Sequence, residues 1–207
     1  KYNTFLFNII KMELAFTERQ IEIIIAATNR IDTHGIQELT IKNLAADIGL
    51  SEAALYRHFK GKNDILLGML NYFIVNMNKR LSLIMSESHP SSSSLLKSIF
   101  ESQLASFQLN PSIVSVIFSE GIFHFNNELS AKVSYIMKMM QENIEQIVKS
   151  GQDNNEFSTL IGSEALTTII MGTMRLVVLK WKLSGHKTNL DNEGAIVLNG
   201  IIKMISR

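Results

Sequence analysis

The chain has no cysteine, and only two of its 207 residues are proline. The absence of cysteine excludes disulfide scaffolds, cysteine-ligated zinc and iron–sulfur sites, and thiol nucleophiles. The five histidines are scattered, and no two of them have the four-residue spacing of a helical metal site. No Ser/His/Asp order and no pair of carboxylates indicates catalysis. We therefore expect a protein without metal or cofactor that is not an enzyme.

The chain also lacks a long apolar run. Its most apolar stretch, residues 169–181, contains three interrupting polar residues. It is shorter than the roughly 20 apolar residues that a membrane-spanning helix needs. Residues 1–11 resemble a signal peptide only faintly, because asparagines interrupt their apolar part and no small-residue cleavage site follows. We expect a cytoplasmic protein that makes no membrane contact.

The chain also has almost no excess of one sign of charge, since its 20 Lys and Arg are nearly matched by 19 Asp and Glu. The first 80 residues carry ten basic and eight acidic side chains, which is a slight excess. A nucleic-acid-binding domain often has a clear basic excess, so the placement of single residues must decide that question here. Hydrophobic residues make up 46% of the chain, enough to form a core.

Apolar residues recur at helical spacing, which predicts an all-α fold of about nine helices. Thr17 is placed to cap the first helix and Gly35 to end it, while the serines of residues 89–94 indicate the clearest linker. The predicted helices cover residues 17–34, 40–49, 51–59, 62–84, 95–109, 112–119, 128–150, 162–184 and 190–206, and Gly151 is expected to end the seventh. We expect an N-terminal extension over 1–16, a small domain over 17–61 and a larger helical domain over 62–207.

Residues 41–59 follow the helix-turn-helix pattern. Ala45 is small where two helices must approach, and Gly49 stands four residues later at the turn, where a left-handed backbone suits glycine. Ser51 can cap the second helix, whose exposed first turn meets base edges in this motif. Apolar residues that would lock the two helices together are Leu44, Ile48, Leu50 and Leu55. An ordinary helical hairpin is the alternative.

Residues 24–66 resemble the N-terminal domain of the TetR family of bacterial transcriptional regulators. The resemblance rests on Gly35, Leu39, Thr40, Ile41, Leu44, Ala45, Gly49, Leu50, Ser51, Leu55, Tyr56, Phe59 and Lys62, all in register. The amino-acid sequence of residues 51–59 is also similar to that of the family's nucleoid-occlusion members. Beyond residue 66 only the number and order of helices match.

The resemblance implies contacts to DNA. Thr40, Tyr56 and Lys62 match phosphate contacts of the family, and the first turn of the recognition helix would face the bases. The implied set is Thr40, Ser51, Glu52, Ala53, Ala54, Tyr56, Arg57, His58, Lys60 and Lys62. Alternatively Thr40 is only a cap, Tyr56 a partly buried aromatic and Arg57 a solvated charge. Glu52 departs from the lysine that many members carry, and an acid there is expected to lower non-specific affinity.

The resemblance also implies a homodimer formed through the last two helices. Apolar residues cover most of the circumference of the helix over 162–184, more than a surface helix with one buried face would show. A fully buried internal helix is the alternative. The predicted interface residues are Ile170, Met174, Val177, Trp181, Val197, Ile201 and Met204.

Soft apolar side chains in the larger domain suggest a pocket for a small effector. Methionine and phenylalanine adapt well to an apolar ligand, although they fill an ordinary core equally well. The candidates are Phe73, Met77, Phe100, Leu104, Phe107, Phe118, His124, Met137, Met171 and Arg175. For Arg175, a salt bridge across a dimer is the alternative.

Together these patterns predict a homodimeric regulator of transcription that binds double-stranded operator DNA. We expect a repressor, released from a pseudo-palindromic operator by a small apolar or amphipathic molecule. In a second hypothesis, the N-terminal domain still binds DNA, but the helical body recruits a protein partner, as in nucleoid occlusion, and senses no ligand.

Overall fold

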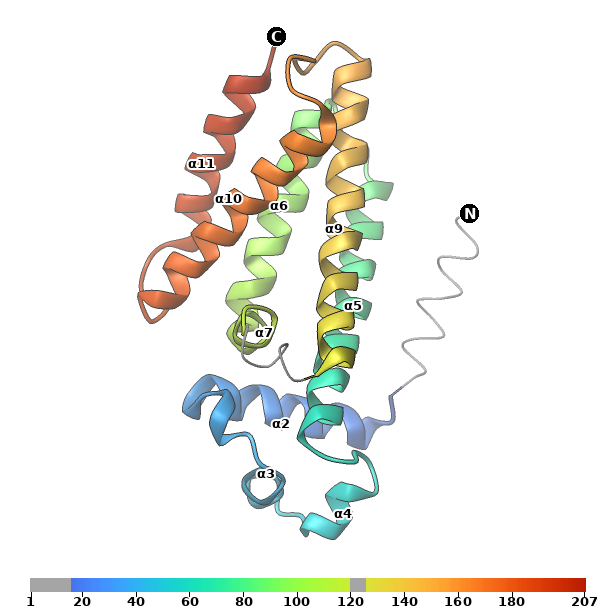
Figure 1. The fold of residues 1–207 in the computed structure, drawn as a ribbon, viewed down its shortest axis with the longest axis vertical. Coiled ribbons are helices and arrows are strands. Elements are labelled where there is room, and N and C mark those ends of the chain that lie inside the picture. The colour runs from blue at the N-terminus through green and yellow to red at the C-terminus, as the bar shows by residue number, and fades with distance from the viewer. Residues whose placement is uncertain (1–15, 120–125) are drawn as a thin grey trace. The chain divides into compact units, whose positions relative to one another are not determined.

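The computed structural model describes residues 16–119 and 126–207, and this part of the chain is all-α (Figure 1). It contains nine α-helices, one short 3-10 helix and no strand. In chain order they are α2 (Glu18–His34), the 3-10 helix η1 (Ile36–Glu38), α3 (Ile41–Asp47), α4 (Glu52–Tyr56), α5 (Lys62–Ser86), α6 (Ser92–Leu109), α7 (Pro111–Ile117), α9 (Asn127–Asp153), α10 (Ser163–Leu183) and α11 (Leu190–Ile205). The predicted all-α class is thereby confirmed.

The chain divides into two compact units. The first comprises residues 16–79 together with 110–119 and 126–134, and in it α2 packs against η1, α3 and α7. The second comprises residues 80–109 and 135–207, and in it α11 packs against both α6 and α10. Helices α5 and α9 each contribute residues to both units.

The start of α2 is fixed by its own sequence. The Thr17 hydroxyl accepts a hydrogen bond from the backbone N–H of Gln20, while the Gln20 side chain accepts one from the backbone N–H of Thr17. This reciprocal pair satisfies N–H groups that have no partner inside the helix. Gly35 follows the helix with a φ of 84°, a left-handed backbone that favours glycine. Both predicted ends of the first helix are confirmed.

The predicted linker over 89–94 is too long, because α6 begins at Ser92. The carboxylate of Glu156 accepts hydrogen bonds from the backbone N–H groups of Ser92 at 2.7 Å and Ser93 at 2.8 Å. The first N–H groups of a helix have no partner within it, and a negative charge is favourable at that end. A residue far along the chain therefore turns part of a serine-rich linker into the first turn of α6.

Gly151 does not end a helix as predicted, since α9 continues to Asp153. A Cβ at Gly151 would lie 2.3 Å from Cδ2 of Phe157, whose side chain is fully buried. The backbone N–H groups of Glu156 and Phe157 both donate to the carbonyl of Gly151, at 2.8 and 3.0 Å. Glycine is therefore needed at 151 for the close approach of an aromatic ring.

The core of the second unit is built from closely packed helices. A Cβ at Gly194 of α11 would lie 2.1 Å from Cδ1 of Leu104 on α6, so α11 approaches α6 through a residue without a side chain. Within the described ranges, no helix is both long and apolar enough to cross a membrane.

Candidate nucleic-acid interface

Helices α3 and α4 are joined by a tight turn. Gly49 has a φ of 64°, and the backbone N–H of Leu50 donates to the carbonyl of Ala45 at 2.9 Å. Leu44, Ala45 and Leu55 are buried, so the facing sides of the two helices form one small core. The predicted helix-turn-helix is confirmed in geometry, including the small residue and the glycine at the turn.

The first turn of α4 has a side-chain cap and is exposed to solvent. The Ser51 hydroxyl accepts a hydrogen bond from the backbone N–H of Ala54 at 3.1 Å. Ser51, Glu52 and Ala53 are exposed, and Ala54 is half-buried. Thr40 caps α3 in the same way, accepting from the backbone N–H of Asn43 at 3.1 Å.

The second helix of the motif is shorter than predicted. It was expected to reach Phe59, but α4 ends at Tyr56, and Arg57 is its C-cap. Phe59 is buried, and its ring lies so close to α5 that a Cβ at Gly68 would be 2.9 Å from it. Beyond Tyr56 the chain forms a turn at residues 57 and 58, and the backbone N–H of Phe59 still donates to the carbonyl of Leu55 at 3.1 Å.

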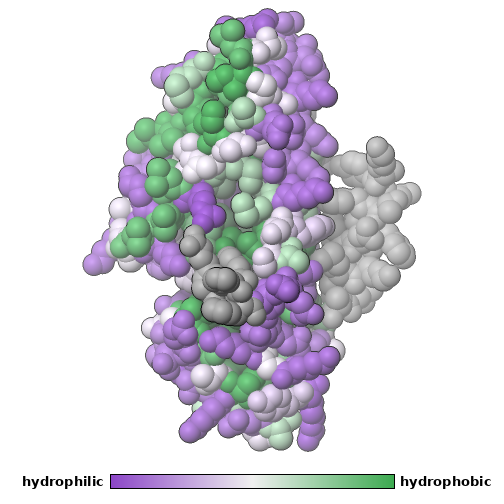
Figure 2. Space-filling view, viewed as in Figure 1, coloured by the Kyte–Doolittle hydropathy of each residue, from purple (hydrophilic) through white to green (hydrophobic). Residues whose placement is uncertain are grey.

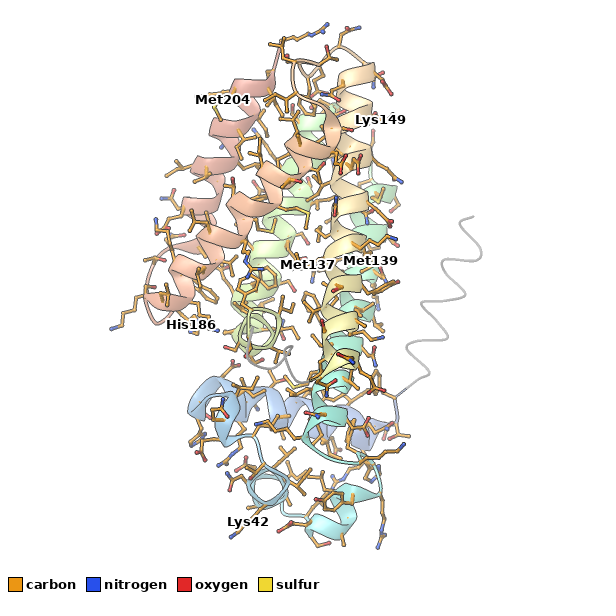
Figure 3. All side chains as sticks on the ribbon, viewed as in Figure 1. Lys42, Met137, Met139, Lys149, His186 and Met204 are labelled. Atoms are coloured by element: carbon orange, nitrogen blue, oxygen red, sulfur yellow. The ribbon has the colours of Figure 1, made fainter. Side chains whose placement is uncertain are left out.

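Basic and aromatic side chains lie near α4. Tyr56, Arg57 and Lys60 are exposed, and His58 is half-buried with its carbonyl accepting from the Gln20 amide at 3.4 Å. Lys42 on α3 is exposed too and projects away from α2 (Figure 3). Lys42 was not among the residues predicted from the sequence, although it lies only two residues after the Thr40 cap.

The ammonium of Lys62 is engaged within the domain. Its Nζ donates to the carbonyl of Ile36 at 2.7 Å and so ties the start of α5 to η1. Desolvation lowers the pKa of Lys62, and the nearby Glu38 carboxylate opposes this shift. An ammonium has three donors, so this bond leaves donors for a phosphate. The phosphate contact itself stays a prediction.

The predicted pocket residues lie in both units and differ in burial. Phe73 and Met77 are buried in the first unit, and Phe118 there is half-buried. In the second unit Met171 is half-buried, whereas Met137 and Arg175 are exposed. The remaining buried candidates of that unit, all on α6, are Phe100, Leu104 and Phe107. His124 lies outside the described residues.

Most of the predicted interface side chains are in the core of a single chain. Five of the seven are buried there, while Val197 is half-buried and Met204 is exposed, projecting from α11 (Figure 3). The buried five are Ile170, Met174, Val177, Trp181 and Ile201. Other apolar side chains of α10 are exposed instead, and the contact of the seven residues with a second copy stays a prediction.

These exposed residues form what we call the outer face. Figure 2 shows apolar surface over α10 and α11. The outer face consists of Ile169, Gly172, Leu176, Leu179 and Leu183 on α10, and Ile196, Gly200 and Met204 on α11. A Cβ at Gly172 or Gly200 would meet nothing within 4 Å, so both glycines open onto free space in one chain.

Comparison with known proteins places the chain in a family. The family described as "Bacterial regulatory proteins, tetR family" matches residues 23–69, and "YsiA-like protein, C-terminal region" matches residues 69–204. Nucleoid occlusion factor SlmA of Shewanella sediminis is 28% identical over 131 residues, which are 63% of this chain. The aligned part is 66% of that relative, so the chain spans slightly less than two thirds of its length.

Solved structures share the fold at low identity. Fatty acid degradation regulator FadR from Bacillus halodurans is 20% identical, with a TM-score of 0.77 over 90% of this chain and 96% of that one. The regulator FadR from Bacillus subtilis, solved in complex with stearoyl-CoA, is 19% identical, with a TM-score of 0.74 over 88% and 97% of the two chains. The capped helix-turn-helix lies within the first family match, and the second match covers the helices from α6 to α11 except for the last residue of α11. The chain therefore belongs to the TetR family of bacterial transcriptional regulators, with a helix-turn-helix DNA-binding domain and a C-terminal region of the YsiA-like type.

Proposed function

We propose that the protein is a homodimeric, ligand-responsive repressor. It acts in the cytoplasm and leaves a pseudo-palindromic operator when a small apolar or amphipathic effector binds to the helical body. The observation that carries the proposal is the uncovered first turn of α4. Ser51, Glu52 and Ala53 are exposed there, while Leu55 anchors the same helix in the core.

In the proposed complex, this first turn lies in the major groove. The Glu52 carboxylate accepts a hydrogen bond from cytosine N4, and the Ala53 methyl contacts a thymine methyl. The exposed Arg57 and Lys60, with Lys42 on α3, provide positive charge for the phosphates. Each phosphate contact adds about 0.9 to the slope of log affinity against log salt.

The outer face supports the homodimer. On α10 its members follow one another at spacings of three and four residues from Ile169 to Leu183, the pattern of a helix seam that packs against another helix. Leu176 is 58% exposed and Leu183 77% exposed in one chain. A contiguous apolar surface of this kind is unfavourable in water, and a second copy of the same face would cover it. The open space at Gly172 and Gly200 permits close helix approach.

A dimer also sets the geometry of recognition. Two recognition helices must lie about 34–36 Å apart to enter successive major grooves on one side of the duplex. An effector would weaken operator binding if it bound better to a state in which the two recognition helices have a different separation. The coupling free energy between two such binding events is typically about 1–3 kcal/mol. The apolar side chains of the helical body suit an apolar or amphipathic effector. The similar regulator FadR from Bacillus subtilis was solved with stearoyl-CoA, a ligand of that class.

The proposal is tested with a duplex selected from a random library. In fluorescence anisotropy titrations, we expect Arg57→Gln and Lys60→Gln to weaken binding and to reduce the salt slope by about 0.9 each. Lys149→Gln is the matched control, because Lys149 is an exposed lysine of α9 in the helical body (Figure 3). Equal effects of the three variants would contradict the assignment of the DNA-binding surface.

The effector part of the proposal has its own readout. Compounds that bind to the protein in calorimetry are added to the protein–operator complex. We expect at least one of them to lower operator affinity about fivefold or more. If every compound that binds to the body leaves operator affinity unchanged, the ligand-responsive part of the proposal is wrong.

A second candidate function is a DNA-binding protein whose body recruits a protein partner. It is favoured by the similarity to nucleoid occlusion factor SlmA, which extends over 131 residues and thus beyond the helix-turn-helix. Mapping of the occupied sites across the chromosome separates the two candidates. Many dispersed sites would favour the recruiting protein, and one or a few promoters would favour the repressor.

A further inference from the structure

The second unit contains a half-buried arginine whose charge is balanced by no acidic side chain of the described residues. Arg80 of α5 donates three hydrogen bonds to α6: Nε to the Ser102 hydroxyl at 3.2 Å, Nη1 to the Ser106 hydroxyl at 2.5 Å, and Nη2 to the Gln103 carbonyl oxygen at 3.0 Å. All three acceptors are neutral. Within residues 16–119 and 126–207, no Asp or Glu forms an ion pair with Arg80.

This arrangement has a cost in hydration free energy, which a bound anion would offset. A guanidinium that is withdrawn from water without an opposite charge loses hydration energy that neutral acceptors replace only in part. Desolvation accordingly lowers the pKa of Arg80. Gln103 and Ser106 are themselves only 3% and 6% exposed, so they are buried polar residues whose side chains orient the guanidinium. Two helices can be joined at lower cost by apolar side chains.

The three hydrogen bonds also leave the guanidinium able to bind a ligand. Arginine has five N–H groups, and each of the three nitrogens uses one of them here, so one remains on Nη1 and one on Nη2. Paired N–H groups of a guanidinium match the two oxygens of a carboxylate or a phosphate. The same stretch of α6 contributes the buried apolar side chains of Phe100, Leu104 and Phe107.

A second buried polar group in this unit lacks a partner. Thr167 of α10 is fully buried, and its hydroxyl makes no hydrogen bond within the described part of the chain. Buried hydroxyls are normally satisfied, and an unpaired one costs free energy. Helix α10 packs against α6, the helix whose side chains accept the hydrogen bonds of Arg80. Among its described residues, this unit therefore has a half-buried cation without an acidic partner and a buried hydroxyl without a hydrogen bond.

We propose that Arg80 binds the anionic headgroup of the effector, an amphipathic molecule with a carboxylate or phosphate at one end and an apolar chain at the other. The inference rests on the proposed effector site in the helical body, and it adds the charge of the ligand and the residue that recognises it. Ser102, Gln103 and Ser106 are positioning residues that hold the guanidinium in the orientation that receives the headgroup.

The test uses three probes that share a ten-carbon chain: decanoate, decyl phosphate and the uncharged 1-decanol. Each is titrated into the full-length protein by calorimetry, below its micelle concentration and without DNA. We expect the wild type to bind the better of the two anions at least about tenfold more tightly than 1-decanol, because charge-assisted hydrogen bonds are the strong ones. The tighter anion identifies the headgroup as a carboxylate or a phosphate.

Two variants assign the preference to this residue. Arg80→Gln keeps a polar side chain without the charge, and we expect it to remove the tenfold preference while the affinity for 1-decanol changes less than about twofold. Arg80→Lys keeps the charge, and it should retain part of the preference. Lys149→Gln removes a positive charge from the surface of the same unit and should change nothing.

Equal affinity for anions and 1-decanol in the wild type would overturn the proposal, and that comparison requires no variant. Binding of none of the three probes to the folded wild type would overturn it as well. So would an Arg80→Gln variant that weakens all three probes alike, since that is the effect of a purely structural arginine. Operator release is measured separately, so a protein that prefers anions but keeps its operator would contradict only the ligand-responsive function.

Discussion

The guanidinium of Arg30 on α2 donates to both carboxylate oxygens of Asp47 on α3, at 2.8 and 2.9 Å. The Nε of Arg30 also donates to the carbonyl of Glu38 at 3.0 Å. One side chain thus joins the first helix of the domain to the 3-10 helix and to the first helix of the DNA-binding motif. Both bonds to Asp47 come from Nη1 of Arg30, and charge-assisted hydrogen bonds of this kind are stronger than neutral ones.

Loss of this link is expected to destabilise the DNA-binding domain. We predict that Arg30→Gln lowers the free energy of unfolding by about 1–2 kcal/mol, because hydrogen bonds to charged groups are lost at a largely buried side chain. Arg19→Gln is the control, since Arg19 pairs with Glu22 on the exposed surface of the same helix, and its effect should be within about 0.5 kcal/mol. Urea unfolding at neutral pH measures both. Equal losses would show that the bridge is not specially stabilising.

The cap that Glu156 provides to α6 is expected to depend on pH. Partial desolvation acts to raise the pKa of this carboxyl, but hydrogen bonds from Ser93 and Ser92 outweigh it, and the pKa is lowered below its ordinary value of 4.5. A lowered folded-state pKa contributes stability above the unfolded-state value, and this stability is lost as the pH falls through the folded-state value.

We therefore predict that Glu156→Gln destabilises the protein by about 1 kcal/mol at pH 7, as loss of a helix cap does, and by less as the pH falls below 4.5. Glu142→Gln is the control, because Glu142 is exposed and lies 3.9 Å from Lys138 in a surface ion pair. Urea unfolding from pH 7 down to pH 4 gives the comparison. A difference between wild type and Glu156→Gln that stays constant with pH would exclude the carboxylate as the source of the stability.

The close approach of Phe157 to α9 predicts a penalty for any side chain at 151. Gly151→Ala places a Cβ 2.3 Å from a fully buried ring, and we expect a loss of about 1–3 kcal/mol from overpacking. Gly162→Ala is the control, because nothing lies within 4 Å of a Cβ there, and it should change stability by less than about 0.5 kcal/mol. Thermal unfolding gives the melting temperatures of the two variants. Similar melting temperatures would show that the ring moves aside freely.

The outer face predicts the effect of a charge on assembly. We expect Leu176→Asp to convert the dimer to a monomer and to weaken operator binding, because a charge buried between two copies lacks a partner. Leu109→Asp is the control, since Leu109 is 82% exposed at the end of α6, away from α10 and α11 in the sequence. Light scattering coupled to size-exclusion chromatography gives both masses. If the Leu176→Asp protein remains dimeric, the outer face is excluded as the dimer interface.

Features set by neighbouring residues could be predicted from the sequence. The caps by Thr17, Thr40 and Ser51 each involve a backbone N–H only three residues away, and the turn glycine lies between two short helices. These local rules were sufficient to locate the helix-turn-helix and to place its first turn on the surface.

Features set by distant residues could not be predicted in this way. The start of α6 depends on Glu156, which lies more than 60 positions further along the chain. On α10 both sides of the helix are apolar, so hydropathy alone could not separate the buried Trp181 from the exposed Leu176. Pairing of Arg80 with α6 likewise joins residues more than 20 positions apart.

The measurement that tests the account most directly is a titration of wild-type protein with its selected duplex, followed by fluorescence anisotropy over a series of salt concentrations. The account predicts saturation at two protomers per duplex and binding about a thousandfold tighter than to a scrambled duplex of the same length. Equal affinity for the two duplexes at every salt concentration would contradict sequence recognition by α4, and with it the proposed operator-bound repressor.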